Sequence, residues 1–358
     1  FGFLKRSLAV LLSVFMIIMV FPSADLGNVL AASSDEDQFR QELKTMIESG
    51  NQVSQDLSKY KITTGRANEI FKELQNGECA LSCAAYGFCY LGMKSANGLA
   101  TTITVYGKEA KNYASNYSKI TTKANQILSG IEPNMTQAEK ALYIHDKLVD
   151  STNFQNSGSL NRYYAAGPLV NGYGVCQGYA NAYKLLLSQA GINAQVVSSD
   201  KMNHAWDYVE IDGNWYHVDA TWDDTRSSQS GTASHQFFLL NDKEVQNKGS
   251  NSHYDWKVAG DSSLTSTSSD YSNSVIHSVT GDMYYSDGIW YYTSGKNIMV
   301  TTLDESTGEV AYTADSNVSI KSVVNGVVTY TSSGITSEYS MLSMSESKAV
   351  AVPQTAAE

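Results

Sequence analysis

The sequence predicts an α+β protein with a helical N-terminal region, a mixed central region and an all-β C-terminal region. Apolar residues recur at helical spacing through much of the first 130 residues. In the centre, a helical pattern that starts directly after Cys176 is followed by a hairpin pattern around Asp212-Gly213. Beyond residue 273, short runs rich in Tyr, Val and Thr alternate with turn signals. Helices followed by a strand-rich half are typical of the α+β class.

The first 31 residues predict a secretory signal peptide. Lys5 and Arg6 precede an apolar run over residues 7–21, and small residues near Ala31 suit cleavage. The run is shorter than the roughly 18–20 apolar residues of a membrane-spanning helix. We therefore expect a protein exported by a bacterium, cleaved near Ala31, extracellular, and without membrane association after cleavage.

The charge of the chain argues against nucleic-acid and anionic-membrane partners. The formal net charge is -11 over 358 residues, and the isoelectric point is about 5.0. Such an acidic chain is repelled by phosphate-rich surfaces. The length allows two or three domains.

Residues 32–130 are predicted to form a helical N-terminal region. Apolar residues recur at helical spacing over 33–50, 66–74 and 106–128. The region either serves only as scaffold or shields an active site as a pro-region does.

Cys79, Cys83 and Cys89 cluster within this region. No His or CxxC pair accompanies them, and their neighbours are mostly apolar. On one helix Cys79 and Cys83 would share a face, which is poor geometry for a disulfide. We expect buried thiols or one disulfide rather than a metal site.

Cys176 is predicted to lie in the first turn of a helix. Gly172 and Gly174 precede it, and a helical pattern runs from Gln177 to a stop at Gly191. Free N–H groups and the helix dipole favour a thiolate at this position. The alternative is a buried thiol that acts only as a small apolar residue.

The stretch 203–219 is predicted to be a β-hairpin that turns at Asp212-Gly213. In that register Trp206 lies opposite Asp219, and His204 is the diagonal neighbour of Asp219 on the same face. This face carries His204, Trp206, Tyr208, Trp215, His217 and Asp219. The other face, expected to be the core side, carries Ala205, Val209, Ile211, Tyr216 and Val218, with Asp207 as a polar exception.

A thiol at a helix N-terminus, an imidazole and a carboxylate are the parts of a nucleophilic Cys-His-Asp site. The carboxylate fixes the imidazole tautomer, the imidazole takes the thiol proton, and the thiolate attacks a carbonyl carbon. His217 shares the hairpin face of His204, so it is a rival for the role of base.

Three motifs resemble those of the bacterial transglutaminase-like family, whose fold is similar to that of papain-type cysteine peptidases. They are Gly174-Val-Cys-Gln-Gly-Tyr-Ala180, Asn203-His-Ala-Trp206 and Trp215-Tyr-His-Val-Asp-Ala-Thr-Trp-Asp-Asp224. The resemblance extends over residues 134–257 and places a catalytic core at 131–257. It implies that Cys176 is the nucleophile, His204 rather than His217 the base, and Asp219 the orienting acid.

Further candidates surround this triad. Gln177, Tyr164, Trp206 and Trp222 are candidates for binding substrate or an oxyanion, as are Tyr163 and the backbone N–H of Cys176. His145, on a helix opened by the capping box Thr136–Glu139, is expected to be structural. Asp223 and Asp224 support the loop, bind a cation or, as we expect, form a solvated turn.

The C-terminal part is predicted to be a β-repeat region. Residues 258–273 are rich in Ser, Thr and Asp and predict a linker to the region 274–358. The run 287–294 recurs as 325–332, an offset of 38 residues. This period indicates either propeller-like blades or a small β appendage. Its aromatic residues either bind a cell-wall or protein ligand or, as we favour, pack the sheets.

The sequence thus predicts a secreted thiol enzyme that forms a thioester from a carboxamide or peptide carbonyl. Transfer of the acyl group to an amine gives cross-linking, and transfer to water gives deamidation or proteolysis. A protein or peptide is the expected substrate, and this chemistry requires no metal and no cofactor. The alternative is a catalytically silent surface-binding or adhesion module on the same fold.

Overall fold

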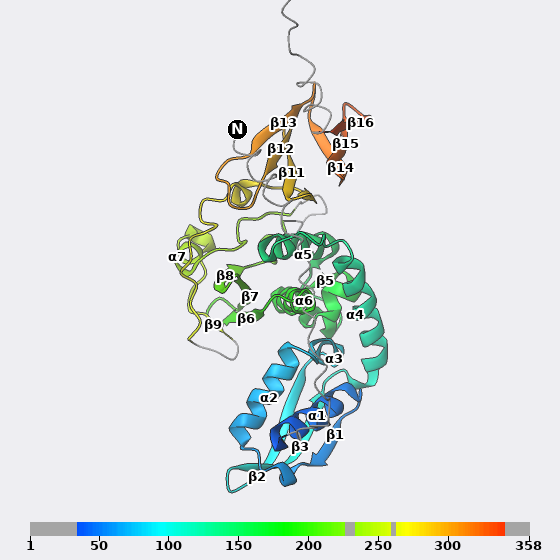
Figure 1. Cartoon of the computed structure of the whole chain (residues 1–358), viewed down its shortest axis with the longest axis vertical. Helices are drawn as coiled ribbons and strands as arrows, with labels where there is room; N and C mark the ends of the chain where they lie inside the picture. Colours follow the sequence, from blue (N-terminus) through cyan, green and yellow to red (C-terminus); the bar gives the residue numbers. More distant parts are fainter. Residues whose placement is uncertain (1–33, 226–232, 259–262, 341–358) are drawn as a thin grey trace, which may run out of the picture. The chain divides into compact units, whose positions relative to one another are not determined.

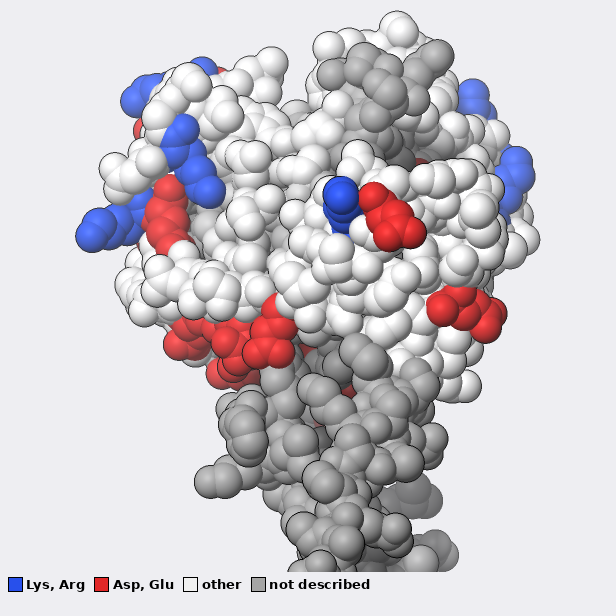
Figure 2. Space-filling model, turned by 90° about the horizontal axis from the view of Figure 1, so that it is seen from above, with Lys and Arg blue, Asp and Glu red and all other residues white. Residues whose placement is uncertain are grey.

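The computed structural model describes residues 34–225, 233–258 and 263–340 (Figure 1). The predicted signal peptide lies outside these residues. Within the described ranges, no helix is both long and apolar enough to cross a bilayer. Most of the face drawn in Figure 2 is uncharged. Lys and Arg are scattered over it, and Asp and Glu form several small groups.

The N-terminal region contains a sheet as well as helices. Its elements are α1 (Asp35–Glu48), β1 (Val53–Asp56), α2 (Thr64–Asn76), α3 (Ala80–Ala85), β2 (Cys89–Ala96), β3 (Leu99–Gly107) and α4 (Tyr113–Leu128). The strands form an antiparallel sheet in the order β1-β3-β2. The predictions of helices over 33–50 and 66–74 are confirmed by α1 and α2.

The predicted helical N-terminal region also contains this sheet, which was not predicted from the sequence. Asn97 and Gly98, with φ of 52° and 78°, form the two-residue turn between β2 and β3. Ile103 and Val105 alternate with threonines, and both are fully buried against α1 and α2. The helix predicted from Tyr106 therefore begins only at Tyr113, because Tyr106 still pairs with β2.

The three N-terminal cysteines are free thiols in the core of this region. Cys79, Cys83 and Cys89 are buried and belong to the apolar cluster of α1, α2 and the sheet. The interaction of Cys83 with Cys89, together with burial, holds the pKa of Cys83 well above its usual range. The first of the two expected outcomes, buried thiols, is the one found.

The central region contains the helices and the sheet that carry the predicted site residues. Its elements are α5 (Gln137–Ser151), β4 (Asn153–Phe154), η4 (Leu160–Tyr163), η5 (Gly167–Asn171), β5 (Tyr173–Gly174), α6 (Cys176–Gln189), β6 (Ala194–Ser199), β7 (His204–Ile211), β8 (Asn214–Val218), α7 (Asp242–Gln246) and β9 (Lys257–Val258). The sheet order is β8-β7-β6-β9, and β7 pairs antiparallel with both β6 and β8.

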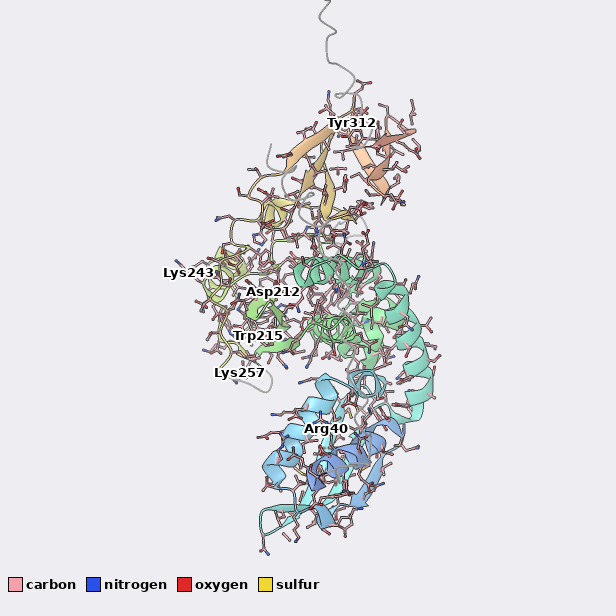
Figure 3. All side chains as sticks on the ribbon, in the orientation of Figure 1. Arg40, Asp212, Trp215, Lys243, Lys257 and Tyr312 are labelled. Carbon is pink, nitrogen blue, oxygen red and sulfur yellow. The ribbon has the colours of Figure 1, made fainter. Side chains whose placement is uncertain are left out.

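The hairpin register is the one predicted. Ile211 pairs with Asn214, and the turn residues Asp212 and Gly213 have φ of 50° and 83°. Asp212 marks the turn and Trp215 the start of β8 in Figure 3. One face of the hairpin packs with α5 and α6 in the main core, as expected from Val209, Ile211, Tyr216 and Val218.

The opposite face of the hairpin is buried too. Trp206 and Tyr208 pack with Val197, Val258 and the partly buried Trp256. The segment 263–273, predicted to be part of a linker, lies along β8. Ser266 Oγ donates to the Trp215 carbonyl oxygen at 2.5 Å, and Tyr216 Oη donates to Ser268 Oγ at 2.7 Å.

The C-terminal region forms two antiparallel sheets. The first contains β10 (Tyr284–Ser286), β11 (Ile289–Ser294), β12 (Asn297–Thr301) and β13 (Glu309–Thr313), and the second contains β14 (Val318–Val324), β15 (Val327–Ser332) and β16 (Ile335–Ser340). The 38-residue repeat places β11 and β15 at equivalent inner positions, each after a turn of two positive-φ residues. Trp290, Tyr291 and Tyr330 are buried, which favours sheet packing over ligand binding for these aromatic side chains.

Candidate active site

Cys176 is the first residue of α6, as predicted, and is half-buried. The chain enters this helix against η4, where the Val175 N–H donates to the Arg162 carbonyl oxygen at 3.0 Å. Gly178 lies so close to the same oxygen that a Cβ there would stand 2.2 Å from it. Glycine at this position therefore allows η4 to pack directly on the first turn of α6.

His204 begins β7, and Asp219 directly follows β8. The register that makes them diagonal neighbours brings His204 Nε2 within 2.6 Å of Asp219 Oδ2. The other carboxylate oxygen, Oδ1, accepts the backbone N–H groups of Thr221 and Trp222 at 3.0 and 3.1 Å. Asp219 is thus fixed at both oxygens.

The Cys176 thiol and the His204 imidazole line the same cleft, and their interaction contributes to the raised pKa of His204. Since Nε2 of His204 is held by Asp219, Nδ1 is the ring nitrogen left for Cys176. Burial lowers the pKa of His204, but the charge and hydrogen bond of Asp219, together with the interaction with Cys176, outweigh it and raise the pKa to about 10. A cationic imidazole beside a thiol stabilises the thiolate.

The carboxylate of this group stays ionised. Burial alone would raise the pKa of Asp219, but the charge and hydrogen bond of His204, together with those of His253, hold it well below its usual range. Cys176, His204 and Asp219 therefore form a connected chain of thiol, imidazolium and carboxylate.

Comparison with known proteins identifies this part of the chain. Residues 122–220 match the family model of the transglutaminase-like superfamily. The chain carries a transglutaminase-like core. The matched range starts within α4 and ends one residue after Asp219, so it includes all three residues of the triad.

Solved structures of low similarity bear related names. A TGase is 16% identical and covers 43% of this chain and 47% of its own, with a TM-score of 0.25. A proposed cysteine protease from Cytophaga hutchinsonii is 15% identical, with coverage of 37% and 62% and a TM-score of 0.25. A proposed protease from Parabacteroides distasonis is 13% identical, with coverage of 37% and 36% and a TM-score of 0.23. This chain spans less than two thirds of each of these proteins. Among curated proteins there is no match.

A second histidine, His253, binds the same carboxylate from outside the matched range. Its Nε2 lies 2.8 Å from Asp219 Oδ2, and its ring is fully buried. The ring packs against Trp206 and Trp222, with centroids 4.6 and 4.3 Å away. Sequence reasoning missed this residue, because it stands in no motif and only the fold brings it to Asp219.

Two tryptophans hold the ring of His204. The Trp222 and Trp206 rings stack on it with centroids 5.1 and 5.6 Å away and interplanar angles of 27° and 21°. The sequence predicts substrate or oxyanion contacts for both. Trp222 does line the cleft beside Cys176, whereas Trp206 is only 1% exposed.

His217, the rival base, is a buried neutral residue of the transglutaminase-like core. Its Nδ1 accepts the indole N–H of Trp206 at 2.8 Å, so Nε2 carries the proton and donates to Asp242 Oδ1 at 2.9 Å. Burial lowers the pKa of His217 to about 4, and the nearby Asp242 carboxylate only partly offsets this. His217 therefore orients Trp206, which in turn packs on His204.

The cleft beside Cys176 and His204 has a volume of about 930 Å³. Gln177, Trp222 and Tyr163 line it. Tyr164, the fourth predicted binding residue, lies instead against Phe88, with ring centroids 4.7 Å apart. The neighbouring Tyr163 occupies the position in the cleft that was expected for Tyr164.

The expectation of a solvated turn at Asp223 and Asp224 is wrong. Asp223 is fully buried and accepts the backbone N–H of Phe237 at 3.1 Å. Asp224 is 9% exposed and accepts the hydroxyl of Tyr179 at 2.6 Å. The turn after Asp219 is buried because the carboxylates of Asp223 and Asp224 accept hydrogen bonds from donors inside the protein.

Among the residues that the structure describes, two groups contain histidine and carboxylate atoms close enough to hold a metal ion. One is His204, Asp219 and His253, which belongs to the triad. The other is His145, Asp146 and His235, where Asp146 Oδ1 lies 2.9 Å from His145 Nδ1 and 3.0 Å from His235 Nε2. All three are buried, and these contacts already form a hydrogen-bonded network, consistent with the structural role expected for His145.

Proposed function

We propose that this protein is a secreted thiol enzyme that acylates Cys176 with a carboxamide or peptide carbonyl of a protein or peptide substrate. The observation that carries the proposal is the chain Cys176–His204–Asp219 at the wall of an open cleft. The transglutaminase-like core supports the same chemistry.

In the first half-reaction the thiolate attacks the carbonyl carbon and forms an S–C bond. The C–N bond then breaks, and the leaving ammonia or amine takes the proton of the His204 imidazolium. The N–H groups at the start of α6 and the side chain of Gln177, which lines the cleft, are the donors proposed for the oxyanion.

In the second half-reaction an amine or water attacks the thioester. The neutral His204 accepts the proton of the attacking group, the S–C bond breaks, and the Cys176 thiolate and the His204 imidazolium are restored. An amine yields a new amide and therefore a cross-link, whereas water yields a carboxylic acid. The acyl-enzyme is common to both outcomes.

The proposal is tested with a glutamine-rich protein and a fluorescent primary amine. Wild type and Cys176→Ala are compared, with Cys79→Ala as a matched control for loss of a buried thiol far from the triad. We expect amine incorporation or ammonia and peptide release that depends on Cys176 and persists in the control. Incorporation identifies a transglutaminase, and release without incorporation identifies a hydrolase. Equal signals from wild type and Cys176→Ala would contradict the proposal.

A further inference from the structure

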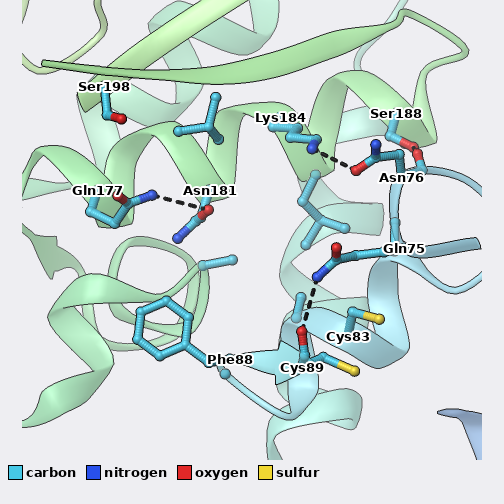
Figure 4. Close-up of a pocket in the computed structure, with 16 residues that line it drawn as sticks. Gln75, Asn76, Cys83, Phe88, Cys89, Gln177, Asn181, Lys184, Ser188 and Ser198 are labelled. Atoms are coloured by element: carbon cyan, nitrogen blue, oxygen red, sulfur yellow. Dashed lines mark hydrogen bonds between the residues drawn. The ribbon is translucent and has the colours of Figure 1, made fainter. Parts of the chain in front are cut away.

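A second pocket opens beside the cleft. It has a volume of about 320 Å³ and shares Phe88, Gln177 and Ser198 with the cleft wall. Figure 4 shows α6 on one side of the pocket and α2, α3 and the start of β2 on another, and β6 also lines it through Ser198. A ligand bound at Cys176 can therefore extend into this pocket past Gln177.

One face of α6 lines the pocket with polar side chains. Gln177, Asn181, Lys184 and Ser188 follow one another at helical spacing from the residue next to the nucleophile. Lys184 Nζ donates to Asn76 Oδ1 at 2.6 Å (Figure 4). Ser188 Oγ donates to the Asn76 carbonyl oxygen at 3.0 Å.

Lys184 is the one charged residue among the sixteen that line this pocket. The others supply amides, hydroxyls, thiols and apolar surface, and none of them is a carboxylate. The hydrogen-bond acceptor beside the Lys184 ammonium is the neutral side-chain amide of Asn76. Burial lowers the pKa of Lys184, and the more distant charge of Asp207 only partly offsets this. A half-buried ammonium in such surroundings gains from an anion that enters the pocket.

We infer that this pocket binds a carboxylate of the acyl donor, through Lys184 with the amides of Asn181 and Gln177 around it. The inference rests on the proposed function, because the same ligand must acylate Cys176. Cys176 and Lys184 are eight residues apart in α6, which is about 12 Å along the helix axis. An extended peptide covers that distance in about three to four residues. The carboxylate is therefore an acidic side chain or a chain terminus about three residues from the acylated carbonyl.

The test uses peptides that carry an iodoacetyl group, so that Cys176 reacts by forming an S–C bond with loss of iodide. Iodoacetyl-Gly-Gly-Asp-amide presents a side-chain carboxylate, and iodoacetyl-Gly-Gly-Asn with a free terminus presents a main-chain one. Iodoacetyl-Gly-Gly-Asn-amide is the uncharged reference. We expect one or both charged peptides to alkylate wild type about tenfold faster than the reference, and the faster one identifies the source of the carboxylate.

In Lys184→Gln the ratio of charged to uncharged rates is expected to fall close to one. Lys119→Gln, which removes an exposed lysine of α4, is the matched control and should keep the wild-type ratio. A ratio near one in the wild type, or a preference kept in Lys184→Gln, would overturn the inference. The rate ratio of wild type is measured without the variant. The inference can therefore still be overturned if Lys184→Gln does not fold.

The reaction with iodoacetamide distinguishes failure of this inference from failure of the proposed function. If wild-type Cys176 reacts rapidly with iodoacetamide but shows no preference among the peptides, only the carboxylate pocket is refuted. If Cys176 resists iodoacetamide and all three peptides, both the pocket and the proposed function fall.

Discussion

One carboxylate oxygen of Asp219 contacts two histidines. Nε2 of His204 and of His253 lie 2.6 and 2.8 Å from Oδ2, while the N–H groups of Thr221 and Trp222 bind Oδ1. The carboxylate therefore cannot rotate without breaking several hydrogen bonds. A fixed carboxylate in turn fixes the ring of His204 toward Cys176.

His253→Leu is expected to slow the reaction of Cys176 although His253 is only a positioning residue. Loss of a hydrogen bond to a charged group corresponds to a decrease of about tenfold or more in the rate of this reaction. His253→Gln, which can still donate to Asp219, should recover part of the rate. The pH profile of Cys176 alkylation should also shift in His253→Leu, because Asp219 then holds His204 less firmly.

The control is His277→Leu, which removes a half-buried imidazole whose Nε2 donates to the Phe238 carbonyl oxygen at 2.9 Å. A His253→Leu variant with the wild-type rate and pH profile would show that His253 only fills space.

At the scale of elements, the position of Cys176 depends on how closely η4 packs against the first turn of α6. Gly178→Ala would place a Cβ 2.2 Å from the Arg162 carbonyl oxygen, so the two elements must separate. We expect a loss of about 1–3 kcal/mol in the free energy of unfolding and slower alkylation of Cys176. Urea denaturation and iodoacetamide kinetics measure both effects.

Gly65→Ala is the matched control for that substitution. Gly65 lies in α2, where an added Cβ would have no neighbouring atom within 4 Å, and its φ is not positive. Alanine there should be neutral or stabilising by up to about 1 kcal/mol. If both variants behaved alike, the close contact at Arg162 would not position the helix.

The buried network of His145 joins α5 to the loop that carries Asp223 and His235. Burial lowers the pKa of His145, but the hydrogen bond to Asp146 and the nearby charge of Asp223, whose Oδ2 lies 3.4 Å from Nε2, outweigh it and raise the pKa to about 9. Because this value exceeds the 6.5 of an unperturbed His, the stabilisation is complete below about pH 6.5 and is lost as the pH rises through about 9.

We therefore expect the melting temperature of wild type to fall between about pH 6.5 and 9 more steeply than that of His145→Gln. Thermal unfolding of both proteins across this range measures the difference. Parallel curves would show that His145 does not carry a proton in the folded protein at neutral pH.

At the scale of the molecule, the strands β10–β12 share the main core with α5 and α6. Trp290, Tyr292 and Leu303 belong to the same apolar cluster as Leu142 and Leu186. The first C-terminal sheet is thus part of the structure that supports the triad.

Trp290→Ala is expected to destabilise the whole protein by about 3–5 kcal/mol, because a large side chain leaves a cavity in this shared core. Ile335→Ala, at a side chain that is 67% exposed, should change stability by no more than about 0.5 kcal/mol. Chemical denaturation, with the reactivity of Cys176 as the probe, tests whether the shared core and the active site unfold together. Loss of the C-terminal sheet alone, with a reactive Cys176, would contradict the shared core.

Local patterns in the sequence predicted those parts of the fold that depend on neighbouring residues. Asp212-Gly213 set the hairpin register, and the glycines before Cys176 marked the start of α6. The strand β3 was not predicted, although its alternation of Ile103 and Val105 with threonines is typical of a strand. His253, Asp223 and Lys184 could not be assigned, since their roles depend on partners that are distant in the sequence.

The central claim is that Asp219 holds a cationic His204 beside the Cys176 sulfur. It is tested most directly by the rate of Cys176 alkylation by iodoacetamide as a function of pH, with the modified residue identified by peptide mass. We expect wild type to react at least about tenfold faster than His204→Gln, which should react as an ordinary thiol does, because only wild type has an imidazolium beside the sulfur. A wild-type profile that coincides with that of an ordinary thiol would contradict the account.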